Sequence, residues 1–259
     1  MSTASPTDIA RRAITLLDLT ELGDEATPDD VAALCARAVG RYGNVAAVCV
    51  WPRHVSMAAR LLAGKGVRIA TVVNFPAGDD AIDDVVELTG EALADGADEI
   101  DLVLPYKAFL SGDRATAEAM IQAVRGAVPA PQRLKVILET GELMAADTIR
   151  AASEMAVRLG ADFIKTSTGK TPRSASPQAT EVMLEVIRSA GRPVGLKPSG
   201  GIRTLADATE YLEQADRIMG AGWATPATFR FGASGLLTAL EAELDGDAAA
   251  GPTSKPGSY

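Results

Sequence analysis

Short apolar runs recur along the chain at an even spacing. Eight segments have the composition of buried strands, and they lie at 16–19, 45–50, 68–73, 99–104, 134–138, 163–165, 194–196 and 217–219. The intervals from the start of the first run to the start of the last average about 29 residues, which is the length of one strand, one helix and their loops. Several runs are apolar at nearly every position, as in a parallel sheet covered on both faces.

The segments between these runs have helical periodicity. Thr27 is a predicted N-cap, followed by Pro28, two acidic residues and apolar side chains at 31, 34, 35 and 38, which is the pattern of a capped amphipathic helix. Similar periodicity is found at 79–94, 113–128, 145–159 and 177–190. Residues 1–13 predict a short extra helix that covers the bottom of the fold.

Strands that alternate with helices predict an α/β fold, either a closed (β/α)8 barrel or a doubly wound sheet. A count of eight, with 217–219 as the eighth strand, and the even spacing favour a single (β/α)8 TIM barrel. We expect one domain over 1–259, with the barrel at about 14–244 and a short N-terminal helix. The Asp, Gly, Ala, Pro and Ser composition of 245–259 predicts a flexible C-terminal tail.

Composition and charge narrow the classes of function. The 259 residues are 47% hydrophobic and 23% charged, which is globular composition. With 25 basic and 34 acidic residues the net charge is −9, and this acidity counts against nucleic acid as a partner while leaving local positive pockets open. No apolar run suits a signal peptide or a membrane span. Cys35 and Cys49 make no disulfide framework, so we expect a cytoplasmic protein.

Charged residues end or interrupt several of the apolar runs, namely Asp18, Asp101, Glu139, Lys165 and Lys197. In a barrel, chemistry gathers where strands end. Two ammonium groups about 6 Å apart at an effective dielectric constant of about 20 repel by roughly 3 kcal/mol, or about two pKa units. Lys165 and Lys197 on adjacent strands therefore predict one neutral, nucleophilic amine that forms an imine with a carbonyl. The alternative is that both lysines only pair with carboxylates.

Hydroxyl- and glycine-rich segments follow the last strands. They are TSTGK at 166–170, PSGGIR at 198–203 and FGASG at 231–235. Barrels commonly bind phosphate with the loops after strands seven and eight and the start of a short helix. The backbone N–H groups of these glycines, with Arg203 or Lys170 as a cation, predict a phosphate site.

Seven segments carry a resemblance to a known family. They are LDLT at 17–20, TVVNFP at 71–76, GADEID at 96–101, ETGEL at 139–143, ADFIKTSTGK at 161–170, KPSGGIR at 197–203 and RFGAS at 230–234. Together they span nearly the whole chain, from about 14 to 240. On these segments the sequence resembles the deoxyribose-phosphate aldolases, which are class I aldolases of the barrel type.

The resemblance implies that Lys165 forms a Schiff base while Asp101 and Lys197 move protons. The implied reaction is reversible cleavage of 2-deoxy-D-ribose 5-phosphate to D-glyceraldehyde 3-phosphate and acetaldehyde, with no cofactor and no metal. The phosphate is expected near Gly169, Lys170, Gly200, Gly201, Arg203, Gly232 and Ser234. One departure is Gly235, where similar members carry a second serine, so weaker phosphate affinity is expected.

Four further residues are expected to support the site. Asp18 would orient Lys170 or Lys197 by an ion pair, and Thr20 lies beside it on the same strand. Cys49 is a packed thiol near the pocket, and a C-terminal tail folded over the mouth would bring the phenol of Tyr259 to the proton-transfer site. A homodimer or higher homo-oligomer is compatible with the Ala- and Val-rich helix faces.

Two other functions remain open on the sequence alone. One is a different Schiff-base barrel aldolase or transaldolase that acts on another phosphosugar. The other is a sugar-phosphate-binding barrel without catalysis.

Overall fold

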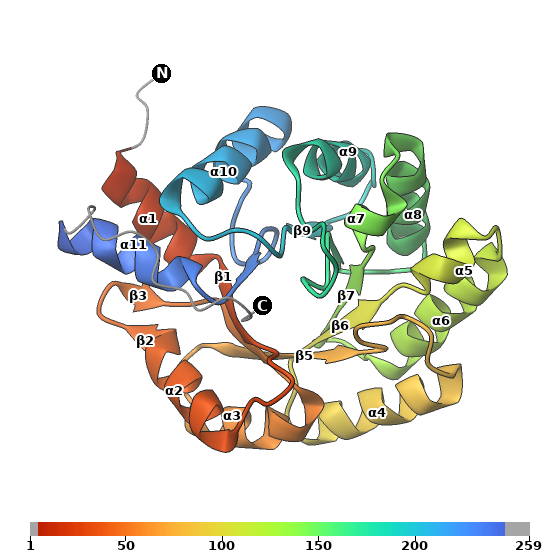
Figure 1. Ribbon diagram of the computed structural model, residues 1–259, viewed down its shortest axis with the longest axis horizontal. Helices are drawn as coiled ribbons and strands as arrows, with labels where there is room; N and C mark the ends of the chain where they lie inside the picture. Colours follow the sequence, from red (N-terminus) through yellow and green to blue (C-terminus); the bar gives the residue numbers. More distant parts are fainter. Residues whose placement is uncertain (1–4, 247–259) are drawn as a thin grey trace.

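The apolar runs form one eight-stranded parallel sheet in the computed structural model, which describes residues 5–246 (Figure 1). The strand order is β10-β1-β4-β5-β6-β7-β8-β9. Parallel bridges join Leu196 to Phe229 and Ser199 to Gly232, so the end strands meet and the sheet closes. The predicted (β/α)8 barrel is therefore confirmed. The strands are β1 (Leu17–Glu21), β4 (Ala47–Val50), β5 (Arg68–Val73), β6 (Glu99–Val103), β7 (Arg133–Ile137), β8 (Phe163–Lys165), β9 (Gly195–Lys197) and β10 (Phe231–Ala233).

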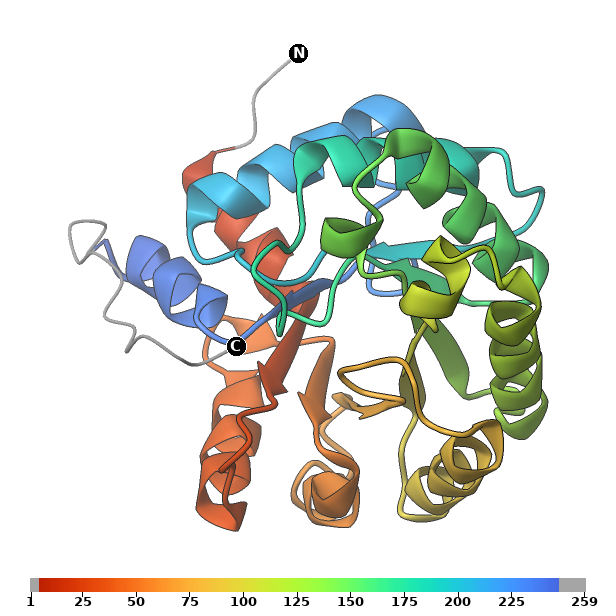
Figure 2. The ribbon, with the colours of Figure 1, turned by 45° about the vertical axis from the view of Figure 1, so that its right-hand side comes forward.

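Helices surround this barrel on the outside (Figure 2). They are α1 (Pro6–Thr15), α2 (Pro28–Ala38), η1 (Pro52–His54), α3 (Val55–Leu61), α4 (Ile82–Ala94), α5 (Tyr106–Leu110), α6 (Arg114–Ala127), α7 (Thr140–Leu143), α8 (Ala146–Arg158), α9 (Pro177–Arg188), α10 (Leu205–Met219) and α11 (Leu236–Asp245). A small hairpin of β2 (Val39–Gly40) and β3 (Gly43–Asn44) follows α2. Within the described residues no helix has the length and apolar character needed to cross a membrane.

The ends of the helices follow the capping signals in the sequence. Thr27 accepts a hydrogen bond from the backbone N–H of Asp30, whose carboxylate accepts one from the Thr27 N–H in return, and the predicted apolar face of α2 is buried. Ser5 and Asp8 cap α1 in the same way, because short polar side chains satisfy the free donors of a first turn. α1 lies beside α10 and α11 (Figure 1).

The prediction of a strand at 217–219 is wrong. These residues are the last turn of α10, whose buried stripe of Ala208, Tyr211, Leu212 and Ala215 continues toward them at helical spacing. The eighth strand of the barrel is instead β10, at 231–233. An apolar run of three residues fits the end of an amphipathic helix as well as a short strand. β10 contains Gly232, which weakens its hydrophobic pattern.

The core has two chemically different parts. Apolar side chains pack between the strands and the surrounding helices. The largest fully buried side chains, however, include four cations, which are Arg230, Lys135, Lys165 and Lys197. The expected boundaries of the barrel at 14 and 244 stay a prediction, and most of the predicted tail, 247–259, lies outside the described residues.

Candidate active site

Seven charged side chains meet inside the barrel, and we call them the buried charge cluster. They are Asp18 on β1, Glu99 and Asp101 on β6, Lys135 on β7, Lys165 on β8, Lys197 on β9, and Arg230 just before β10. Each is at most 1% exposed. Side chains two residues apart on a strand point to the same face, which places Glu99 and Asp101 together. Lys165 and Lys197 are direct partners in the register of β8 and β9.

Asp101 lies at the centre of the part of the cluster that contains the three lysines. Its Oδ2 accepts hydrogen bonds from Lys165 Nζ at 3.0 Å and from Lys197 Nζ at 2.8 Å. Its Oδ1 accepts one from Lys135 Nζ at 2.7 Å. The two lysines predicted to lie side by side therefore do so, with a shared carboxylate between them.

The remaining charges of the cluster, those of Asp18, Glu99 and Arg230, are paired as well. Asp18 lies 2.6 Å from Lys197 Nζ through Oδ2 and 2.6 Å from Arg230 Nη1 through Oδ1. Glu99 lies 2.8 Å from Arg230 Nη2 through Oε1 and 2.7 Å from Lys135 Nζ through Oε2. These contacts form one continuous network, as buried charges require.

The charges of this network do not balance when all of its members are ionised. Four buried cations face three buried carboxylates, so one positive charge is in excess. Arg68, which reaches Glu99 at 3.7 Å, is 40% exposed and also lies near the carboxylate of Asp98, so it does not change this excess. A guanidinium does not lose its proton in a protein, which leaves the three lysines. The release of one proton from a lysine therefore neutralises the cluster.

The surroundings select Lys165 as that lysine. Burial lowers the pKa of Lys165, the charge of Lys197 lowers it further, and its single bond to Asp101 does not compensate. Burial alone would lower the pKa of Lys197 too, but Asp101 and Asp18 outweigh burial and raise it well above the ordinary value. Asp101 and Glu99 raise the pKa of Lys135 in the same way. Lys165 is thus the amine that is most readily neutral and nucleophilic.

The carboxylates respond in the opposite sense. Burial opposes ionisation of Asp101, but Lys135, Lys197 and Lys165 hold its pKa well below the usual range. The pKa values of Asp18 and Glu99 are also lowered against burial by the cations around them. All three carboxylates are therefore charged at neutral pH and can accept protons only transiently.

Three members of the cluster, Glu99, Lys135 and Arg230, were not predicted as site residues. They lie inside an apolar strand or just before one, rather than at the carboxyl end of a strand. Glu99 lies two residues before Asp101, and Lys135 lies two residues before Ile137, so the members of each pair lie on the same face of their strand. Inward-facing parity was the available signal, since a charge there must be paired.

The structure describes three of the four predicted supporting residues, and their contacts differ. Asp18 pairs with Lys197, whereas Lys170 pairs with the exposed Asp24 at 2.8 Å, so the predicted alternative of an Asp18–Lys170 pair is wrong. The Thr20 hydroxyl donates to the Asp18 carbonyl at 2.8 Å. Cys49 is fully buried on β4, and burial raises the pKa of its thiol, which suits a packed, neutral thiol. Tyr259 lies outside the described residues.

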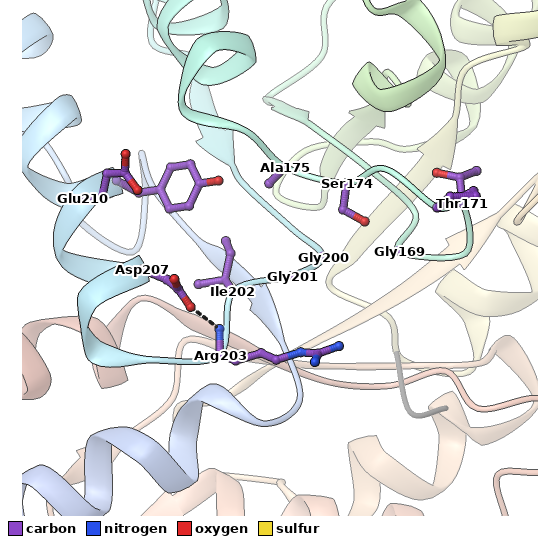
Figure 3. Close-up of a pocket in the computed structure, with 12 residues that line it drawn as sticks. Gly169, Thr171, Ser174, Ala175, Gly200, Gly201, Ile202, Arg203, Asp207 and Glu210 are labelled. Atoms are coloured by element: carbon purple, nitrogen blue, oxygen red, sulfur yellow. Dashed lines mark hydrogen bonds between the residues drawn. The ribbon is translucent and has the colours of Figure 1, made fainter. Parts of the chain in front are cut away.

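A cavity of about 440 Å³ lies beside the loops that follow β8 and β9 (Figure 3). Four of the predicted phosphate-binding residues line it, namely Gly169, Gly200, Gly201 and Arg203. Ser174, Asp207, Glu210 and Tyr211 are among the other lining residues. The loops that line the cavity follow the strands that end in Lys165 and Lys197, but none of the seven residues of the buried charge cluster lines it.

Glycine is required at two points around this cavity. Gly200 has a φ of +81°, and a Cβ there would lie 2.5 Å from Ser174 Oγ. Gly201 also has a φ of +81°, in the left-handed region that favours glycine. At both positions the backbone borders the cavity with no side chain between them, and the Gly200 N–H donates to the Gly232 carbonyl at 3.4 Å.

The remaining predicted phosphate residues lie outside the cavity lining. Gly232 is on β10, where a Cβ would lie 2.6 Å from Ser199 Cβ and 3.1 Å from Lys197 Cε, so its glycine lets β10 approach the lysine strand. Ser234 follows it, and Gly235 caps α11 without a side-chain hydrogen bond. The Arg203 backbone N–H donates to Asp207 at 2.9 Å while its side chain extends away from that carboxylate (Figure 3).

Comparison with known proteins decides the family. Residues 12–241 match the model described as DeoC/LacD family aldolase. The chain belongs to the DeoC/LacD aldolase family. It is an aldolase, and the resemblance inferred from the seven sequence segments is confirmed.

Individual relatives of this aldolase agree with the family match. The deoxyribose-phosphate aldolase of Agrobacterium fabrum strain C58 is 53% identical over 239 residues, 92% of each protein. A crystal structure from Coccidioides immitis, of a protein proposed to be a deoxyribose-phosphate aldolase, has a TM-score of 0.80 at 33% identity and covers 91% of this chain and 87% of that one. The tetrameric deoxyribose phosphate aldolase of Aeropyrum pernix has a TM-score of 0.73 at 26% identity, covering 93% and 92%.

Proposed function

We propose that this aldolase reversibly cleaves 2-deoxy-D-ribose 5-phosphate to D-glyceraldehyde 3-phosphate and acetaldehyde through an imine on Lys165. The observation that carries the proposal is the buried charge cluster, in which Lys165 alone has a lowered pKa among the three lysines. The glycine-lined cavity beside it suits a phosphorylated substrate. The substrate class is supported by the 53% identity to a deoxyribose-phosphate aldolase.

The covalent step begins with Lys165 as a neutral amine. Its Nζ lone pair attacks C1 of the open-chain aldehyde and forms a carbinolamine. Protonation of the carbinolamine hydroxyl, through Lys197 or a water, then lets water leave and gives a protonated imine, which withdraws electrons from the neighbouring carbon atoms. The protonated imine brings a positive charge back to the Lys165 nitrogen, which lies 3.0 Å from the Asp101 carboxylate, so the cluster already holds a counter-ion for it.

Asp101 carries the proton in the bond-breaking step. Directly or through one water, its carboxylate accepts the proton of the C3 hydroxyl, the C2–C3 bond breaks, and its electron pair forms the enamine on Lys165. Lys135 and Lys197 hold the pKa of Asp101 low, so Asp101 passes the proton on rather than keeping it. Lys197, 2.8 Å away, is the group beside it in this relay. Reprotonation of the enamine and hydrolysis then release acetaldehyde.

The loops after β8, β9 and β10 would bind the phosphate. The N–H group of Gly201 would supply a donor at the cavity and Arg203 would supply charge, while the Gly200 N–H already donates to the Gly232 carbonyl at 3.4 Å. Ser234 and the first turn of α11, which Gly235 leaves without a side-chain cap, offer further donors. Lys170 shares its charge with an 81% exposed Asp24 side chain. Such an exposed pair is weak enough to yield to a phosphate.

Borohydride trapping tests the central step. The protein is incubated with acetaldehyde, reduced and digested, and the peptides are analysed by mass spectrometry. We expect an N-ethyl group on Lys165, while the exposed Lys107, whose pKa is raised by its bond to Asp79, serves as the internal control and stays unmodified. An active enzyme with an unmodified Lys165 would refute the mechanism.

Donor specificity separates this function from the alternatives. The proposed enzyme uses acetaldehyde as the donor and does not use dihydroxyacetone phosphate, whereas another Schiff-base aldolase or a transaldolase would have the opposite preference. A sugar-phosphate-binding barrel without catalysis would bind the phosphosugar and leave the methyl protons of acetaldehyde unexchanged.

Location and assembly are also proposals. A cytoplasmic location is supported by Cys35 and Cys49, both buried free thiols, and cell fractionation tests it. A homodimer or higher homo-oligomer is supported by the tetramer described for the Aeropyrum pernix enzyme. Sedimentation equilibrium of the purified chain tests the assembly.

A further inference from the structure

Glu139, at the end of β7, is a fully buried carboxyl group outside the buried charge cluster. Its backbone is left-handed, with φ 57° and ψ 61°. This conformation costs a non-glycine residue about 1 kcal/mol or more, and it persists only where the surroundings hold it. Burial also raises the pKa of this carboxyl, against the hydrogen bonds it accepts.

The Glu139 side chain bonds to the loop that follows β8. Its Oε2 accepts a hydrogen bond from the backbone N–H of Thr168 at 3.2 Å and from the Thr168 hydroxyl at 2.5 Å. The Thr168 Oγ1 in turn accepts the backbone N–H of Lys170 at 3.1 Å. One carboxyl group thus fixes the segment that contains Gly169 and Lys170.

The backbone of Glu139 holds the same loop by a second route. Its carbonyl accepts the N–H groups of Glu142 and Leu143 and so starts α7. A Cβ on Gly141, in this helix, would lie 2.2 Å from the Arg173 carbonyl oxygen. α7 therefore packs closely against the far side of the loop that follows β8. The left-handed turn at Glu139 allows both the Glu139 side chain and α7 to contact this loop.

A purely structural residue would not need to be a carboxyl group here. Within residues 5–246, Glu139 Oε1 is buried and makes no hydrogen bond of good geometry, although the Thr171 hydroxyl is near enough to lower the pKa of the carboxyl. The neighbouring hydroxyls of Thr140 and Ser167 also have no partner there. Such atoms cost folding free energy. A leucine of similar length would avoid that cost, but it would also release Thr168.

We propose that Glu139 is a positioning residue that holds residues 168–170 in place for the phosphate of the substrate. The inference rests on the proposed function. Glu139 does not belong to the network of Lys165, Asp101 and Lys197, so the imine chemistry should proceed without it. Its loss should therefore weaken the binding of phosphorylated substrate more than it slows the chemical steps.

Steady-state kinetics with two substrates test this division. In Glu139→Ala we expect KM for 2-deoxyribose 5-phosphate to rise about tenfold, as for a lost hydrogen bond to a charged group, while kcat and KM for unphosphorylated 2-deoxyribose stay close to wild type. Glu139→Gln keeps an acceptor oxygen for Thr168 and should restore most of the affinity. Glu142→Gln, an exposed change on the same helix, is the matched control and should leave both substrates unaffected.

A double-mutant cycle tests the route through Thr168. Thr168→Val removes the hydroxyl that links Glu139 to Lys170, and it should raise KM for the phosphorylated substrate by itself. Combined with Glu139→Ala it should add little more, because both changes break one chain of contacts. Thermal unfolding of each variant identifies any that does not fold, and if Glu139→Ala is one, Glu139→Leu, which fills the same space without an acceptor for Thr168, takes its place in the cycle.

Two results would overturn the inference. One is an equal loss of activity toward both substrates in Glu139→Ala. The other is full additivity with Thr168→Val. Wild-type protein that fails to cleave 2-deoxyribose 5-phosphate would instead refute the proposed function, and it would do so before any variant is measured.

Discussion

Two neighbouring regions handle charge in different ways, the interior of the barrel and the loops at its mouth. In the interior, charged side chains on the strands and at their ends are fully buried and pair mainly with one another, with Arg68 reaching Glu99 from the edge at 3.7 Å. At the mouth, a cavity is lined by glycines with left-handed backbone and by one exposed arginine, Arg203. Coulomb energies at 4 Å are about 1 kcal/mol in bulk water and about 4 kcal/mol at an effective dielectric constant of about 20. The interior can therefore shift pKa values, whereas the mouth can bind an anion and release it.

This difference predicts that changes in the interior alter chemistry or folding strongly and that changes at the mouth alter substrate affinity modestly. Variants of the interior and of the mouth test the two sides of that division.

Lys165→Met should produce the largest loss. We expect kcat to fall by roughly 10⁴-fold or more, because the amine that forms the covalent intermediate is gone. The folded state should remain about as stable as wild type, since removal of the surplus cation leaves three cations and three carboxylates. Activity assays and chemical denaturation measure the two effects. A strongly destabilised variant would contradict the charge count.

Asp101→Asn should follow, with kcat lower by about 10²- to 10⁴-fold, the range for loss of a general acid–base group. The carboxylate raises the pKa of Lys165, so its neutralisation lets that pKa fall further. The acid limb of the pH profile of kcat/KM should therefore move to lower pH. A limb that moves to higher pH would mean that another group controls it.

Arg230→Met should act on folding rather than on chemistry. It leaves Asp18 and Glu99 buried with fewer partners, which costs about 3–5 kcal/mol. Their pKa values, lowered in the folded protein partly by Arg230, should rise. Carboxylates with lowered pKa stabilise the fold above their unfolded values, and this stability is lost as pH falls through the folded ones. The midpoint of acid unfolding should therefore move to higher pH, and an unchanged midpoint would show that the pairs contribute little.

The fold follows from the sequence wherever a strand is long or evenly spaced. The run at 68–73 coincides with β5, because four apolar residues in six, rich in β-branched side chains and bounded by turn signals, have few other interpretations. The run at 217–219 misleads because three residues do not distinguish the end of α10 from a strand. β10 escapes notice because it is short and contains Gly232.

The site could be predicted only in part, for a related reason. Lys165 and Lys197 stand out because a polar residue at the end of a barrel strand has a meaning in any barrel, and Asp101 stands out because it interrupts an apolar run. Lys135 interrupts its run in the same way and could be found by its inward parity, whereas Arg230 precedes a short strand that the apolar pattern does not reveal. The contacts of Glu139 depend on a left-handed backbone that no propensity favours.

Arg203→Met should test the mouth with a moderate effect. The backbone bond to Asp207 remains, and only the exposed cation is removed. We expect KM for phosphorylated substrate to rise roughly tenfold and to depend less on salt, because exposed charges are screened. KM for 2-deoxyribose should not change. Arg188→Met, an exposed change at the end of α9, is the control, and an equal effect there would argue for general electrostatics.

Gly235→Ser should give the smallest effect and the only gain. A Cβ at Gly235 meets no atom within 4 Å, and its φ of −84° suits any residue, so the substitution adds a hydroxyl without strain. That hydroxyl lies at the start of α11, where it can donate to a phosphate, a bond worth about 0.5–1.5 kcal/mol, or roughly two- to tenfold in KM.

The control for this gain is Gly235→Ala, which supplies the same Cβ without the hydroxyl. Both variants reduce the freedom of the unfolded chain, so both should stabilise the fold slightly. Only the serine variant should lower KM, and only for phosphorylated substrate. If alanine lowers KM as much as serine, rigidity of the loop rather than a hydrogen bond limits phosphate binding. Phosphate affinity at the mouth would then depend on the order of the backbone, whereas the chemistry of the interior depends on its paired charges.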